Sequence, residues 1–76
     1  MPRLGNELMI DNCISDLRQQ SGLTQQDLAD LISVTRATVV ALERGGYNPS
    51  LELAFRVARV FGVRVDETFF VREESI

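Results

Sequence analysis

The sequence predicts a single all-α domain built from five short helices, with a short tail at each end. Three observations support this fold class. The chain has 76 residues, which is enough for one compact core and too few for a second domain. Its hydrophobic content of 45% comes mainly from Leu, Val, Ile and Ala, which recur at spacings of three and four residues. Short polar stretches rich in turn-forming residues separate these apolar patterns.

The two tails differ from the helical region in pattern. Residues 1–10 end in the apolar run Leu8-Met9-Ile10, which fits either a disordered arm or a short edge strand. We expect the domain itself to span residues 11–71. Residues 72–76 then form a C-terminal tail.

The first two predicted helices have clear start and stop signals. Asp11 or Asn12 is a suitable N-cap for the first helix, which ends at Ser21-Gly22 because Gly adopts the left-handed conformation that terminates helices. Thr24 is a suitable N-cap for the second helix, over residues 25–32, whose apolar stripe consists of Leu28, Leu31 and Ile32.

The next two helices follow the same logic. Thr35 can cap a third helix over residues 36–44, which Gly45-Gly46 ends. Asn48-Pro49-Ser50 forms a loop and a cap, and a fourth helix runs to Gly62. The apolar residues of that fourth helix, spaced to fill one face, are Leu51, Ala54, Val57, Ala58 and Phe61. Beyond it, residues 65–69 suit a one-turn helix and Phe69-Phe70-Val71 has the composition of a strand.

Residues 25–44 contain the most specific pattern in the chain. Apolar residues occupy the places that two helices crossing through a short turn must bury, namely Leu28, Ile32, Val34, Val39 and Leu42. The small residue Ala29 lies where the two helix axes approach closely. Together with caps at Thr24 and Thr35, this pattern predicts a helix-turn-helix.

Composition excludes several other classes of protein. A lone cysteine, Cys13, cannot form an internal disulfide, and the absence of histidine argues against a metal site or acid–base catalysis. No Gly-rich phosphate loop is present. No stretch resembles a signal peptide or membrane span, so we expect a cytoplasmic protein that is not an enzyme and needs no cofactor. The net charge of −3 argues against nucleic acid, yet all eight cations are Arg, which is suited to phosphate and guanine.

The chain resembles the Xre family of regulators, the phage-repressor and Cro type of helix-turn-helix protein, over about residues 11–71. The stretches that carry the resemblance are Ser21-Gly22-Leu23-Thr24-Gln25-Gln26-Asp27-Leu28-Ala29, Val34-Thr35-Arg36, Leu42-Glu43-Arg44-Gly45, Tyr47-Asn48-Pro49-Ser50-Leu51-Glu52-Leu53-Ala54 and Gly62-Val63-Arg64-Val65-Asp66-Glu67. The resemblance implies a five-helix, lambda-repressor-like domain that binds double-stranded DNA as a homodimer. It places the third helix in the major groove.

The resemblance also assigns residue roles. The residues expected to contact DNA are Thr24, Gln25, Gln26, Thr35, Arg36, Ala37, Thr38, Val40, Arg44, Tyr47 and Asn48. Arg36 is the best candidate base reader, while Gln25 and Arg44 are expected to contact phosphate. The family often has Gln where Ala37 stands and Lys where Gly46 stands, so its usual base contact is absent and phosphate contact shifts toward Arg44.

Simpler interpretations of these residues stay open. Arg36 and Arg44 fit ordinary solvated helix positions, and Thr24 and Gln25 fit plain helix starts. Tyr47 suits packing against the fourth helix, and Asn48 suits a turn. Cys13 is interpreted as a small buried hydrophobe, with a redox role as the alternative.

Two structural features also follow from the resemblance. In the family, residues at the positions of Arg18 and Glu43 commonly form a partly buried ion pair that joins the first and third helices. Ser33 stands where the family often uses Gly, because the backbone there tends toward positive φ.

Apolar residues in excess of one small core predict a dimer interface. Leu53, Phe55 and Phe70 are in excess of the stripe on the fourth helix. A strand at Phe69 to Val71 can pair with its symmetry mate or with Leu8-Met9-Ile10, and core filling is the competing interpretation.

Two function classes therefore stay open. The first is a sequence-specific transcriptional regulator, acting as a repressor by occupancy of its site. The second is a protein-binding module of the same fold, such as a DNA-binding antitoxin or an anti-repressor, which the acidic balance, Ala37 and Val40 favour.

Overall fold

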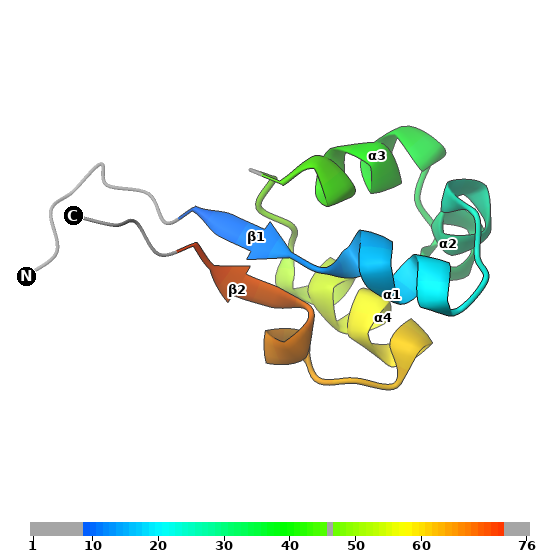
Figure 1. Cartoon of the computed structure of the whole chain (residues 1–76). Coiled ribbons are helices and arrows are strands. Elements are labelled where there is room, and N and C mark those ends of the chain that lie inside the picture. Colours follow the sequence, from blue (N-terminus) through cyan, green and yellow to red (C-terminus); the bar gives the residue numbers. More distant parts are fainter. Residues whose placement is uncertain (1–8, 46, 73–76) are drawn as a thin grey trace, which may run out of the picture.

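The computed structural model describes residues 9–45 and 47–72, which form a helical body with a small two-stranded sheet at one end (Figure 1). Its helices are α1 (Ile14–Gln20), α2 (Gln25–Ile32), α3 (Arg36–Arg44), α4 (Leu51–Phe61) and the 3₁₀ turn η1 (Val65–Glu67). Its strands are β1 (Ile10–Asn12) and β2 (Phe69–Val71). The arm residues before Met9, Gly46 and the last four tail residues lie outside the described residues. No helix among those described is long and apolar enough to cross a membrane.

The prediction of five helices, the last of them a single turn within residues 65–69, is correct in part. The described residues contain four α-helices, and the fifth helical segment is the single 3₁₀ turn η1. Thr68 closes this turn, because its N–H donates to the carbonyl of Val65 at 2.9 Å and its hydroxyl donates to the same oxygen at 2.7 Å. The chain then enters β2 as predicted, so the turn cannot continue as a helix.

The start of α1 also differs from the prediction. Asp11 and Asn12 belong to β1, and the N-cap position of α1 is occupied by Cys13. Asn12 still stabilises the helix start, since its Oδ1 accepts from the Ile14 N–H at 3.0 Å. β1 pairs antiparallel with β2, with Ile10 opposite Val71. The edge-strand interpretation of the N-terminal segment is therefore correct for Ile10, and the strand continues to Asn12, while Leu8 lies outside the described residues.

The predicted N-caps of α2, α3 and α4 are confirmed. Thr24 and Asp27 form a reciprocal capping box at α2, with the Asp27 N–H donating to Thr24 Oγ1 at 3.0 Å and the Thr24 N–H donating to Asp27 Oδ2 at 2.9 Å. The hydroxyl oxygens of Thr35 and Ser50 accept from backbone N–H groups in the first turns of α3 and α4, at 3.3 and 3.1 Å. These caps set where each helix begins.

The core lies between α1, α2, α3, α4 and β2. Its buried residues are Ile14, Leu28, Ala29, Ile32, Val39, Leu42, Leu53, Ala54, Val57 and Phe69. Leu53 and Phe69 are each only 9% exposed, which favours the core-filling interpretation of these two residues over a place in a dimer interface. Leu31 and Leu51, which the helical pattern placed inside, are instead exposed.

Candidate DNA-binding interface

The turn between α2 and α3 fixes the angle between these helices. Ser33 adopts a left-handed conformation with φ of 62°, as predicted for this position. The next N–H, from Val34, donates to the carbonyl of Ala29 at 3.0 Å. Ala29 itself is fully buried, and its small side chain allows the two helices to approach closely. The α2–α3 pair is therefore a helix-turn-helix with a closed, hydrogen-bonded turn.

The faces of α3 separate buried from exposed side chains. Val39 and Leu42 are fully buried and hold the helix on the core. Arg36, Ala37 and Arg44 are exposed, as are Thr35 before the helix and Tyr47 and Asn48 after it. Thr38 and Val40 are partly buried. The outer face thus presents two cations at its ends and small or apolar side chains between them.

The predicted ion pair between Arg18 and Glu43 is present. Arg18 Nε donates to Glu43 Oε2 at 2.6 Å, and its Nη2 donates to Oε1 at 3.2 Å. The side chains are only 13% and 9% exposed, and hydrogen bonding to Glu43 raises the pKa of Arg18 above its usual value. Arg18 also donates to the carbonyl of Leu23 at 2.9 Å. The pair therefore ties α1 both to α3 and to the loop before α2.

Gln25 extends this pair into a network that the sequence did not predict. Its Nε2 donates to Glu43 Oε1 at 3.1 Å, and its Oε1 accepts from Arg36 Nη2 at 3.4 Å. Gln25 therefore connects the first turn of α2 to both ends of α3. No periodicity or spacing in the sequence could show this, because the contact depends on how the two helices cross.

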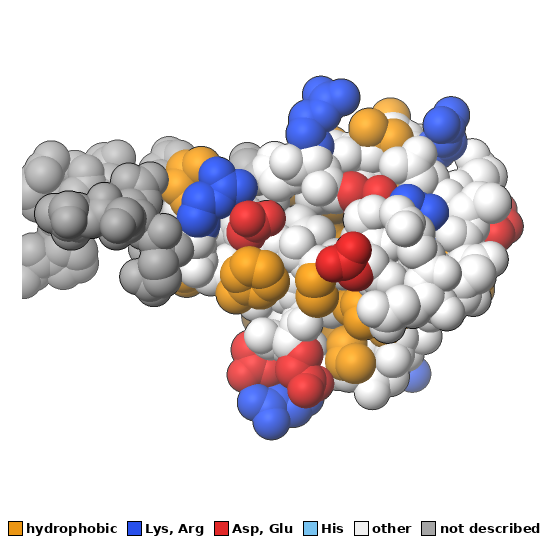
Figure 2. Space-filling model, in the orientation of Figure 1, with side chains coloured by type: hydrophobic (Ala, Val, Ile, Leu, Met, Phe, Trp, Pro, Cys, Tyr) orange, Lys and Arg blue, Asp and Glu red, His pale blue; other side chains and the backbone are white. Residues whose placement is uncertain are grey.

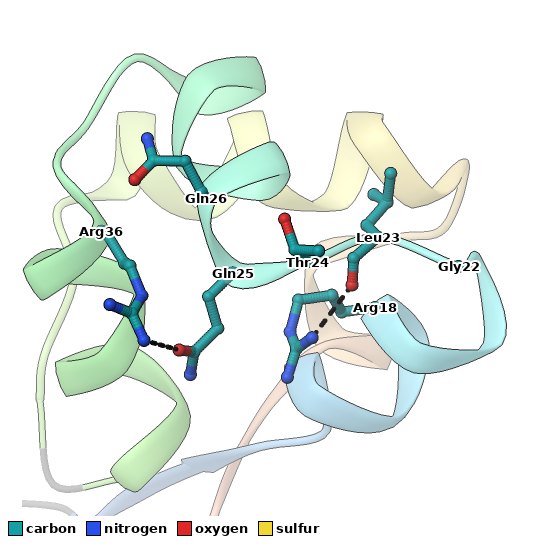
Figure 3. A pocket seen from close by; sticks show the side chains of 7 residues that line it. All are labelled: Arg18, Gly22, Leu23, Thr24, Gln25, Gln26 and Arg36. Carbon is teal, nitrogen blue, oxygen red and sulfur yellow. Dashed lines mark hydrogen bonds between the residues drawn. The ribbon is translucent and has the colours of Figure 1, made fainter.

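These side chains surround an open hollow of about 620 Å³ at the start of α2. Figure 3 shows Arg18 and Arg36 flanking Gln25, with Thr24 and Gln26 on the same rim. Gln26 and Thr24 are exposed, and Gln25 is partly buried. A helix N-terminus attracts anions through its free N–H groups and its dipole. The hollow therefore combines the guanidinium of Arg36, side-chain amides and a helix N-terminus, which suits a phosphate group, whereas the Arg18 guanidinium is already paired with Glu43.

The cations of α3 are not neutralised by neighbouring carboxylates. Within the described residues no carboxylate lies within 4.0 Å of Arg36 or Arg44, whereas Arg56, Arg64 and Arg72 are each paired with an acidic side chain. Figure 2 shows separate cationic side chains along the edge where α3 lies, whereas at the opposite, lower end cationic and acidic side chains lie together. The outer face of α3 is therefore locally cationic, although the net charge of the whole chain is −3.

The other predicted site residues are placed as follows. Cys13 is partly buried, and its Sγ lies 3.2 Å from the carbonyl oxygen of Glu67. Phe55, Phe70 and Val71 are exposed at 54%, 46% and 43%. No group of His, Cys, Asp or Glu that could hold a metal is found in residues 9–45 and 47–72.

The crossed α2–α3 pair and its cationic outer face define a helix-turn-helix domain. A profile described as helix-turn-helix matches residues 14–67, and the chain belongs to that family, the Xre-like class that its sequence resembles. It is 44% identical over 63 residues to an HTH-type transcriptional regulator of Archaeoglobus fulgidus, covering 83% of this chain and 90% of the relative.

Two further similarities extend this result. The chain is 34% identical over 68 residues to RstR, a cryptic phage CTXphi transcriptional repressor in Vibrio cholerae, covering 90% of this chain and 61% of RstR. Among solved structures, the restriction-modification controller protein C.AhdI from Aeromonas hydrophila superposes with a TM-score of 0.65 and 33% identity. That superposition covers 71% of this chain and 82% of the controller protein.

Proposed function

We propose that this protein is a cytoplasmic transcriptional regulator that binds a specific double-stranded DNA site as a homodimer and represses by occupying it. The observation that carries the proposal is the unpaired cationic outer face of α3. Arg36 and Arg44 are eight residues apart, about 12 Å along a helix axis, so one cation lies at the start of the helix and the other at its end.

The two cations have different roles in this proposal. Arg36 lies in the first turn of α3, where side chains of a recognition helix reach base edges. Arg44 lies in the last turn, beside exposed Tyr47 and Asn48, where a guanidinium reaches phosphate. The hollow at the start of α2 holds a second phosphate, and the α2 N-terminus contributes its N–H groups.

Repression and dimerisation are supported by separate observations. The similarity to the repressor RstR supports repression. Dimerisation is supported by the exposed apolar side chains and by the small surface that one recognition helix covers, since two half-sites give the affinity that one cannot. The proposal includes no catalytic step and no cofactor.

Binding to DNA from upstream of the protein's own gene and to random duplex, measured by fluorescence anisotropy at several salt concentrations, tests this function. We expect Arg36→Ala to cost about 1–3 kcal/mol on the specific site and to relax discrimination at one base pair. Arg44→Ala should weaken binding to both DNAs alike and lower the salt slope by about one per half-site. Arg59→Ala on α4 removes the same charge from another exposed position and should change neither quantity.

A protein-binding module of the same fold is the second candidate function. Exposed Ala37 and partly exposed Val40 favour it, because neither side chain can hydrogen-bond to a base edge. If Arg36→Ala and Arg44→Ala lose the same binding affinity on the specific site and on random duplex, Arg36 contacts phosphate and reads no base. If neither variant loses affinity relative to Arg59→Ala, the protein-binding module becomes the better assignment.

A further inference from the structure

Among residues 9–45 and 47–72, the two outer edges of the β1–β2 sheet differ in the hydrogen bonds that cover them. The Cys13 N–H donates to the carbonyl of Thr68 at 3.1 Å, and the Arg72 N–H donates to the carbonyl of Met9 at 2.7 Å. Because hydrogen-bonded and non-hydrogen-bonded pairs alternate in an antiparallel ladder, the backbone of Phe70 faces β1. The backbone groups of Phe69 and Val71 therefore point to the outer edge of β2.

At the outer edge of β1, the Asn12 N–H and the Asn12 side chain already make contacts within the chain. The Asn12 N–H donates to Asp11 Oδ1 at 2.8 Å. The Asn12 side chain donates to the carbonyl of Leu42 at 2.7 Å and accepts from the Ile14 N–H at 3.0 Å. These contacts fasten β1 to α1 and to the end of α3. Within the described residues, no comparable hydrogen bond covers the outer edge of β2.

The open edge also carries exposed apolar side chains. Phe69 is buried and anchors β2 to the core, whereas Phe70 and Val71 are 46% and 43% exposed. Met9, across the sheet, is 41% exposed. Natural proteins usually protect a strand edge with charge, proline or a covering segment, because an open apolar edge pairs with other strands. Figure 1 shows the β1–β2 sheet projecting from the helical body.

We propose that β2 pairs antiparallel with β2 of a second copy of this chain, about a two-fold axis through Phe70. Phe69 then lies opposite the partner's Val71, and the reciprocal pair is identical by symmetry. In this register, the outward N–H and C=O groups of Phe69 and Val71 form hydrogen bonds in both copies. The result is one four-stranded sheet in the order β1-β2-β2-β1, with the two Phe70 side chains adjacent at its centre.

Charge supports a second copy as the occupant of this edge. Asp11 lies directly across the ladder from Phe70 and therefore shares its face of the sheet. Its carboxylate accepts from Arg72 Nη2 at 3.1 Å, so this face carries a neutral ion pair. Two copies can therefore approach without like-charge repulsion across the axis. The inference rests on the homodimer of the proposed function and identifies the segment that forms it.

Disulfide trapping tests this register in the full-length protein without DNA. In a Cys13→Ser background, Phe70→Cys places two thiols in a non-hydrogen-bonded pair with Cα atoms about 4.5 Å apart, within disulfide range. Val71→Cys is the matched control, because its symmetry-related Cα atoms lie about 8 Å apart, beyond that range. Phe55→Cys, on the exposed face of α4, tests the competing possibility that the dimer forms through α4. We expect Phe70→Cys to cross-link at least ~10-fold faster than either control under mild oxidation.

A second variant tests the edge without thiols. Val71→Pro removes an outward N–H but no bond to β1, and proline is tolerated on an edge strand when its nitrogen faces outward. We expect it to weaken dimerisation at least ~10-fold by sedimentation while leaving the circular dichroism spectrum unchanged. Three outcomes would overturn the proposal. Phe55→Cys cross-links fastest, all three cysteine variants cross-link at equal rates, or Val71→Pro dimerises with unchanged affinity. Anisotropy with the same variants reports DNA binding separately, so failure of this interface is distinguishable from failure of the proposed function.

Discussion

Replacing Glu43 by Ala should lower stability far more than an ordinary surface substitution. The side chains of Arg18 and Glu43 are 13% and 9% exposed, and removing one partner of a buried pair costs about 3–5 kcal/mol. Arg18 keeps its hydrogen bond to the carbonyl of Leu23, so we expect the lower end, about 3 kcal/mol. For a domain of this size, that loss corresponds to a decrease in Tm of about 12–24 °C.

Thermal and urea unfolding followed by far-ultraviolet circular dichroism measures this effect. Glu52→Ala is the matched control, because it removes a carboxylate from an exposed ion pair with Arg56 and should cost about 0.5 kcal/mol or less. Glu43→Gln keeps the shape of the side chain and one acceptor oxygen. Its decrease in the free energy of unfolding should therefore lie between those of Glu43→Ala and Glu52→Ala. If Glu43→Ala destabilises no more than Glu52→Ala, the pair is solvated and the argument from burial is wrong.

Two further predictions concern backbone strain and pH. Ser33→Gly should be neutral or should stabilise by up to about 1 kcal/mol, since Ser33 has φ of 62°, and a clear loss in urea unfolding would show that its side chain is needed. Hydrogen bonds from Thr24 lower the pKa of Asp27 below its usual 3.8. The stabilisation from Asp27 is therefore present above that pH and lost as pH falls through the lowered pKa. Asp27→Asn should reduce the acid-dependent loss of stability in this range, and an unchanged pH profile would contradict the role of this cap.

Local features of the fold were predictable from sequence because their causes are local. The caps at Thr24, Thr35 and Ser50 depend on residues within one turn, whereas the left-handed conformation of Ser33 was expected only from the family resemblance. The Arg18–Glu43 pair was expected from the family resemblance alone.

Features that depend on distant segments were not predictable in the same way. The strand at Ile10–Asn12 forms only because Phe69–Val71 lies beside it, and no nearby residue specifies that register. Leu53 fills the core once α4 is in place, although the helical pattern alone made it appear in excess. The bridging role of Gln25 likewise depends on how α2 and α3 cross.

The pairing of β1 with β2 has a consequence for the order in which the chain folds. Ile10 and Val71 are 61 residues apart, so closing this contact from an open chain costs about 4 kcal/mol of loop entropy. The helices rely on contacts much closer in sequence and can form first. During synthesis, the backbone of β1 cannot pair with β2 until residues 69–71 have left the ribosome. The sheet is therefore expected to close last in folding and to open first in native-state hydrogen exchange.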